Sequence, residues 1–103
     1  MYCIAIDLGG TIIKIGLVKG AEILEFNSFP AKAWSLADNL PVMETVIDRL
    51  LGKWRVSKEE LSVIGLAFPG MVNPKEKRVT STNYKYDDAC YIYLASWVYR
   101  NWE

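Results

Sequence analysis

Asp7-Leu8-Gly9-Gly10-Thr11 is the stretch that decides the fold, because it separates two short runs with strand character. Tyr2–Ile6 is largely apolar and predicts a buried strand, and Ile12–Val18 predicts a second strand. Two adjacent glycines between such runs are a strong hairpin signal. We therefore expect Asp7 where a buried strand ends and Thr11 where the next strand begins.

The same stretch has the chemistry of a phosphate site. Glycines at a turn leave backbone N–H groups uncovered by side chains, and the hydroxyl of Thr11 adds another donor. The carboxylate of Asp7 is a ligand type that suits the Mg²⁺ of a nucleotide. On these residues alone a tight turn without a ligand remains an open alternative, and the chain contains neither a G-x-G-x-x-G fingerprint nor a P-loop.

A third strand and a long helix follow the hairpin. Glu22–Phe26 alternates weakly and predicts a strand antiparallel to the second, with Phe29-Pro30 ending it. Three such strands in succession would form an opening antiparallel meander. Asp38–Trp54 has apolar residues at helical spacing and predicts a helix that packs on the sheet. Its expected apolar face consists of Val42, Val46, Ile47, Leu50, Leu51 and Trp54.

Local signals mark both ends of this helix. Pro41 is expected in the first turn, where a missing N–H is tolerated, so Asp38 or Asn39 should be the N-cap. Gly52 is expected to mark the end of the helix, as glycine commonly does at a C-terminus.

The next strand is expected beside the first. Ser57-Lys58-Glu59-Glu60 has the S-x-x-E pattern of a capping box and predicts a single helical turn. Leu61–Phe68 is largely apolar and predicts a strand buried on both faces. Strand–helix–strand order implies parallel pairing with the first strand through a right-handed crossover. The loops that contain Gly9 and Gly70 would then face one cleft, the usual ligand position in open α/β sheets.

The remainder of the chain combines a polar, turn-rich stretch with a final helix. Arg78-Val79-Thr80 predicts a short returning strand, and Ser81-Thr82-Asn83 has side chains that can hydrogen-bond sugar hydroxyls or cap a helix. Asp87 or Asp88 is expected to cap a helix over Ala89–Trp102, and a strand over Cys90–Leu94 remains an open alternative.

Bulk composition excludes several classes of partner. The 103 residues suffice for one domain, and 12 basic residues balance 12 acidic ones, which argues against nucleic acid and anionic membranes as partners. No apolar run has the length of a membrane span, and no signal peptide is recognisable, so we expect a cytoplasmic protein. Cys3 and Cys90 are isolated and the chain has no histidine, so no zinc ligands are expected.

Two motifs resemble those of one known family. Asp7-Leu8-Gly9-Gly10-Thr11, followed by Lys14 and Gly16, resembles the first phosphate motif of the ROK family (repressor, ORF, kinase) in the actin, hexokinase and Hsp70 superfamily. Ile64–Pro74 and then Ser81-Thr82-Asn83 resemble its strand ending in Pro-Gly and its sugar-binding Asn.

The resemblance implies both a fold and a set of roles. The fold would be α/β, a ribonuclease H-like (actin-like ATPase) half-domain whose mixed sheet has the antiparallel meander, a parallel fourth strand and two packing helices. Gly9, Gly10 and Thr11 would contact the β- and γ-phosphates of ATP, and Asp7 would organise Mg²⁺ indirectly. Lys14 would take the place of a basic family residue, since Ile12 stands where many members have a polar or basic side chain. The sugar contacts would be Gly70, Met71, Thr82 and Asn83.

By the same resemblance, residues 1–103 are the N-terminal lobe of an ATP-dependent, glucokinase-like hexose kinase. The general-base Asp is expected after Glu103, as are the Cys-rich zinc loop and the adenosine-binding C-terminal lobe. Without a general base and the second lobe the 103 residues should be inactive. The chain would then be a piece of a longer kinase or a truncated reading frame.

Two alternatives come from other functional classes. The first is the sugar-sensing domain of a ROK repressor, which carries a helix-turn-helix ahead of the phosphate motif; here that motif begins at Asp7. The second is a non-catalytic fragment that forms a homo-oligomer through an exposed apolar surface.

Overall fold

The computed structural model describes residues 1–32 and 35–67, and the backbone of residues 71–73 and 78–81. The final helix expected over residues 89–102 lies outside the described residues, as do Gly70, Thr82 and Asn83. The elements in chain order are β1 (Tyr2–Leu8), β2 (Ile12–Lys19), β3 (Glu22–Pro30), α1 (Leu36–Lys53), a 3₁₀ turn η1 (Lys58–Glu60), β4 (Leu61–Ala67), β5 (Met71–Asn73) and β6 (Arg78–Ser81).

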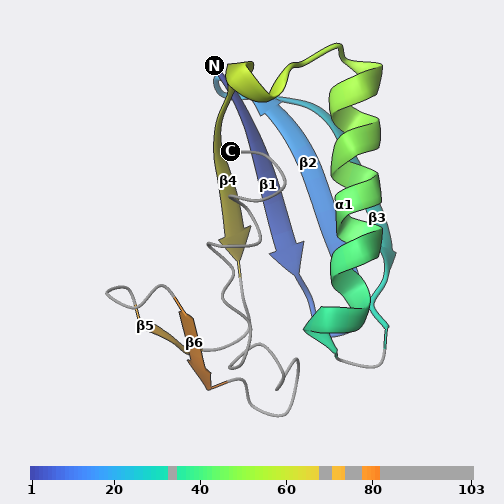
Figure 1. The fold of residues 1–103 in the computed structure, drawn as a ribbon, viewed down its shortest axis with the longest axis vertical. Coiled ribbons are helices and arrows are strands. Elements are labelled where there is room, and N and C mark those ends of the chain that lie inside the picture. Colours follow the sequence, from blue (N-terminus) through green and yellow to red (C-terminus); the bar gives the residue numbers. More distant parts are fainter. Residues whose placement is uncertain (33–34, 68–70, 74–77, 82–103) are drawn as a thin grey trace.

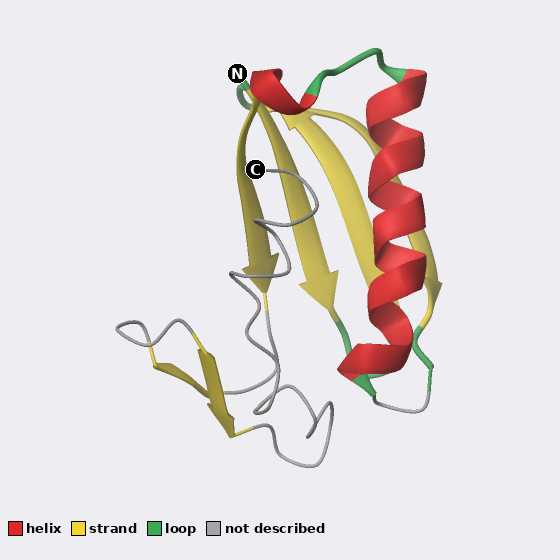
Figure 2. Ribbon diagram, viewed as in Figure 1, coloured by secondary structure: helices red, strands yellow, loops and turns green. Residues whose placement is uncertain are grey.

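Four of these strands form one mixed sheet with the order β3-β2-β1-β4. The β1–β2 and β2–β3 pairs are antiparallel, and β4 lies parallel to β1 (Figure 1). The predicted meander and the predicted parallel fourth strand are therefore confirmed. Helix α1 runs along one face of this sheet (Figure 2), and β5 and β6 pair antiparallel as a separate two-stranded sheet.

The core lies between α1 and the facing side of the sheet. Every second residue of β1 and β2 is buried there, as expected for strands with one covered face. These residues are Ile4, Ile6, Leu8, Ile13, Ile15 and Leu17. Helix α1 contributes Leu36, Met43, Val46, Ile47, Leu50 and Leu51, which recur at helical spacing.

Strand β3 is longer than the sequence predicts. It continues past Phe26 and ends at Pro30, which is in register with Ile12. Proline fits here because β3 is an edge strand in which alternate residues donate to β2. Since the Ala31 N–H donates to the Thr11 carbonyl oxygen (2.9 Å), the donor that Pro30 lacks falls on the side of β3 away from β2.

The predicted start of the helix is wrong. The N-cap of α1 is Ser35, whose Oγ accepts a hydrogen bond from the Asp38 N–H (3.2 Å). Asp38 lies in the first turn, and Asn39 is buried against the preceding loop. Pro41 lies in the second turn rather than the first, and the helix continues through it to Lys53.

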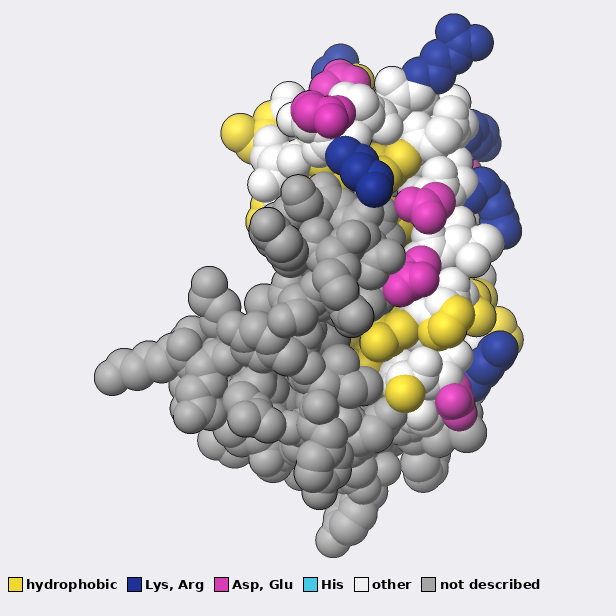
Figure 3. Space-filling model, in the orientation of Figure 1, with side chains coloured by type: hydrophobic (Ala, Val, Ile, Leu, Met, Phe, Trp, Pro, Cys, Tyr) yellow, Lys and Arg dark blue, Asp and Glu magenta, His cyan; other side chains and the backbone are white. Residues whose placement is uncertain are grey.

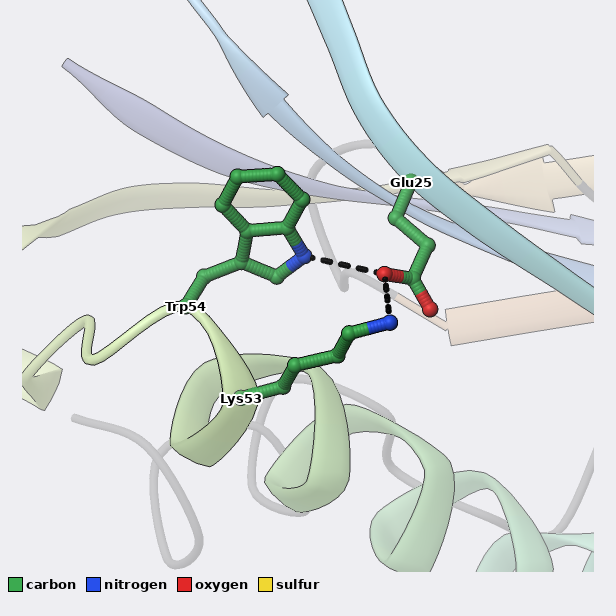
Figure 4. A network of polar contacts seen from close by, with 3 residues as sticks. All are labelled: Glu25, Lys53 and Trp54. Atoms are coloured by element: carbon green, nitrogen blue, oxygen red, sulfur yellow. Dashed lines mark hydrogen bonds and ion pairs between the residues drawn. The ribbon is translucent and has the colours of Figure 1, made fainter.

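The end of α1 also differs from the prediction. Gly52 lies inside the helix, and the residue with a left-handed backbone is Arg55 (φ 54°). Trp54, predicted to face the core, is 40% exposed. Its indole N–H donates to Glu25 Oε1 (3.1 Å), and Lys53 Nζ lies 2.7 Å from the same oxygen (Figure 4). The last turn of α1 is therefore tied to β3 by polar contacts, and these lower the pKa of Glu25, with the Lys53 contact the larger cause.

The predicted capping box is confirmed, but the predicted two-sided burial of the following strand is wrong. The Glu60 carboxylate accepts hydrogen bonds from the N–H and the hydroxyl of Ser57, both 3.1 Å, and η1 is a single turn. In β4, Ile64 and Leu66 pack on the core, whereas Val63 is 53% exposed. The reason is that α1 covers only one face, and no other described element covers the opposite face of β4.

Candidate functional site

The β1–β2 hairpin has the geometry of a tight turn. The Gly9 N–H donates to the Ile12 carbonyl oxygen (3.0 Å), so the chain reverses over Gly10 and Thr11. Neither glycine has a positive φ. Glycine is needed at position 9 for a steric reason, because a Cβ there would overlap the Ile12 carbonyl oxygen. The Gly9 N–H thus closes the turn, and a contact between Gly9 and a phosphate stays a prediction.

Asp7 and Lys14 lie at the centre of a row of registered residues that crosses the sheet. Asp7 is in register with Lys14 on β2 and with Ala67 on β4, and Lys14 is in register with Ser28 on β3. Directly paired residues share a face of the sheet. The sequence neighbours of Asp7 and Lys14 are buried under α1, so these two side chains lie on the opposite face. Both charged side chains are exposed, and in the described part of the chain no ion pair joins them.

The strands that precede the two predicted binding loops end side by side. The last registered pair of the parallel β1–β4 ladder is Asp7 with Ala67. This confirms the prediction that strands one and four end together. Gly70 lies outside the described residues, so its position relative to Thr11 is not part of this finding.

The β5–β6 pair bears on the predicted sugar-binding residues. Met71 is in register with Ser81, which confirms the predicted return strand around Arg78–Thr80. Met71 directly follows Gly70, and Ser81 directly precedes Thr82 and Asn83 in the sequence. The pairing therefore brings together the backbone positions next to both predicted groups of sugar contacts.

An open groove of about 510 Å³ lies on the sheet face opposite α1. Its floor consists of small residues from three strands, and Asp7 and Lys14 also line it. The small residues are Ala5, Gly16, Gly65 and Ala67. Apolar side chains on this face are well exposed, with Ile23 at 65% and Phe26 at 61%. The α1 side differs, since acidic and basic side chains are interspersed over it (Figure 3).

Asn39 is a residue that the sequence reasoning assigned to the wrong role. It is fully buried and makes hydrogen bonds to the backbone of Lys32 and Ser35. The available signal was its helical phase, because position 39 falls on the same face of α1 as Leu36 and Met43. A polar residue at a core-facing position points to a specific hydrogen-bonding partner.

The described part of the chain shows neither a membrane-spanning helix nor a metal-binding cluster. No helix there combines the length and apolar character needed to cross a bilayer. Within the same ranges, no three His, Cys, Asp or Glu side chains gather where a metal ion could bind, and Cys3 is a half-buried free thiol.

Comparison with solved structures places the fold among sugar kinases. A candidate N-acetylmannosamine kinase from Listeria monocytogenes is 25% identical with a TM-score of 0.75, covering 99% of this chain and 32% of that one. The ROK hexokinase from Thermus thermophilus is 19% identical with a TM-score of 0.69, covering 93% of this chain and 32% of that one. A ROK family glucokinase from Streptomyces griseus, solved with glucose and AMPPNP, is 18% identical with a TM-score of 0.59, covering 87% and 29%.

The chain thus spans about a third of the length of these structures. A comparison with curated proteins gave no match. The model of the ROK family matches residues 3–88, which contain the β1–β2 hairpin, α1 and the β1–β4 pairing. The chain therefore belongs to the ROK family.

Proposed function

We propose that residues 1–103 are the N-terminal lobe of an ATP-dependent hexose kinase, glucokinase-like in its substrate class. The observation that carries this proposal is the register of Asp7 with Ala67 at the ends of two parallel strands. It sets the start of the Asp7–Thr11 hairpin beside the end of β4, the strand that precedes Gly70 in the sequence. The chain belongs to the ROK family and its structural neighbours are sugar kinases, which supports the same function.

In this proposal the hairpin binds the phosphates of Mg·ATP. Asp7 orients Mg²⁺ indirectly, Gly9, Gly10 and Thr11 approach the β- and γ-phosphates, and Lys14 adds positive charge. The donor set fits such a ligand, because an exposed carboxylate and an exposed ammonium lie on one face, next to a turn with an exposed threonine. Bound Mg²⁺ would neutralise charge on the phosphates, while these residues bind and orient the group that is transferred.

The sugar would be held by Gly70, Met71, Thr82 and Asn83. Support comes from the Met71–Ser81 register, which places the flanks of both segments together. The general-base Asp and any structural zinc would belong to parts of the protein beyond this chain. The 103 residues alone would therefore be inactive, and the whole protein would act in the cytoplasm.

The test is sugar-dependent ADP release by the full-length protein with Mg·ATP. Glucose and N-acetylmannosamine are the first substrates to try, because the names of two structural neighbours mention them. We expect turnover with at least one hexose and none with the 103-residue chain assayed in parallel. Sugar binding without ADP release from any hexose would overturn the kinase assignment and favour a sugar-sensing role.

A further inference from the structure

Asn39 on α1 is the one fully buried polar side chain in the described part of the chain. Its Oδ1 accepts from the Lys32 N–H (2.9 Å), and its Nδ2 donates to the carbonyl oxygens of Lys32 (3.1 Å) and Ser35. Both donors of the side-chain amide and its acceptor are therefore used. Burying an amide is costly unless it is satisfied in this way, so the position favours a residue with both donor and acceptor groups.

Asn39 is not needed to begin the helix. Ser35 already caps α1 through its bond from the Asp38 N–H. The neighbours of Asn39 on the same helix face, Leu36 and Met43, are apolar and fully buried. The polar side chain between them hydrogen-bonds both the N–H and the carbonyl oxygen of Lys32, which accounts for an amide at this apolar position.

The segment held by Asn39 also holds the predicted phosphate hairpin. Ala31, directly before Lys32, donates its N–H to the Thr11 carbonyl oxygen (2.9 Å). Thr11 is thus fixed by a residue outside its own hairpin. A continuous path runs from the Asn39 side chain on α1 through the backbone of Lys32 and Ala31 to Thr11.

We propose that Asn39 is a positioning residue that fixes Thr11 relative to α1 and thereby sets the hairpin for binding the phosphates of ATP. This inference rests on the proposed kinase function. Asn39 touches no ligand in this proposal and acts only through Lys32 and Ala31. Misplacement of a binding group by a fraction of an ångström to an ångström is enough to weaken its contribution.

The test compares Asn39→Ala with Met43→Ala in the full-length protein. Met43 is equally buried on the same helix, takes no part in the hydrogen bonds that link Asn39, Lys32 and Ala31 to Thr11, and controls for general loss of stability. Hydrogen exchange of the Ala31 and Lys32 amides should become at least about tenfold faster in Asn39→Ala than in Met43→Ala. In steady-state kinetics the KM for Mg·ATP should rise about tenfold, while the KM for the sugar changes less than about twofold.

The two readouts separate the two proposals. If the wild-type protein releases no ADP with any hexose, the kinase proposal fails, and the exchange data still decide whether Asn39 holds the hairpin segment. If exchange at Ala31 and Lys32 is the same in both variants, or if the KM for Mg·ATP is unchanged, the positioning role is overturned. Should Asn39→Ala not fold, Asn39→Ser, whose hydroxyl can still donate to the Ser35 carbonyl oxygen but not hold Lys32, is expected to show the same effects.

Discussion

Asp7 on β1 lies directly opposite Lys14 on β2, and both side chains are exposed on the sheet face that α1 does not cover. Opposite charges in such a pair typically contribute about 0.2–1 kcal/mol when they interact. In the described part of the chain Lys53 and Glu25 form an ion pair, whereas none joins Asp7 to Lys14. Under the proposed function, the carboxylate of Asp7 and the ammonium of Lys14 would face the cation and the anionic oxygens of Mg·ATP.

The first prediction concerns this carboxylate. Asp7→Asn should lower sugar-dependent ADP release by about 10–100-fold, the usual effect of losing a group that orients a metal ion from the outer shell. Raising the Mg²⁺ concentration should restore part of the rate. The measurement is a coupled assay over a Mg²⁺ titration. The matched control is Asp48→Asn, the same change at an exposed position of α1. Equal rates for Asp7→Asn and the control would remove Asp7 from the site.

The second prediction concerns the turn itself. Gly9→Ala should destabilise the protein by about 1–3 kcal/mol, because its Cβ would overlap the Ile12 carbonyl oxygen and the backbone would have to shift. Gly52→Ala is the control, since a Cβ there meets no atom within 4 Å and the residue is helical. It should be neutral or stabilise by up to about 1 kcal/mol. Urea unfolding of both variants measures the contrast, and similar midpoints would contradict it.

The third prediction concerns Glu25 on β3, which contacts Lys53 and Trp54 at the end of α1. Its pKa is lowered below the ordinary value of 4.5 by the Lys53 and Trp54 contacts. A lowered folded-state pKa gives stability that is fully present above pH 4.5 and is lost as the pH falls through the folded-state value. Glu25→Gln should therefore melt at a lower temperature than wild type at pH 7, with the difference shrinking below pH 4.5. Thermal melts at pH 7, 4 and 3 test this, and a constant difference would show that the charge is irrelevant.

The fourth prediction concerns the apolar face opposite α1. We propose that residues 1–103 self-associate through it, because Ile23, Phe26 and Val63 are all more than half exposed. Phe26→Lys should shift the chain toward monomer in sedimentation at micromolar concentration. Thr45→Lys adds the same charge on α1 and should leave the distribution unchanged. A monomer in the unsubstituted chain would end this proposal.

Local patterns in the sequence were enough to predict the meander, the amphipathic helix and the parallel fourth strand. The apolar and β-rich runs of β1 and β2 and the helical spacing in α1 depend on neighbouring residues, so they can be recognised without the fold. The Asp7–Thr11 and Pro69-Gly70 motifs pointed to the ROK family for the same reason. Pairing of β1 with β4 followed from chain order, because a strand, a helix and a further strand favour a parallel crossover.

Only the tertiary structure decided which polar groups hydrogen-bond to one another and which side chains are buried. It placed Ser35 rather than Asp38 at the cap, tied Trp54 to Glu25, and buried Asn39 against Lys32. It also left one face of β4 uncovered among the described residues, although its sequence is apolar. The physical reason is that periodicity reports which side chains share a face, whereas partners and burial depend on which element packs on that face.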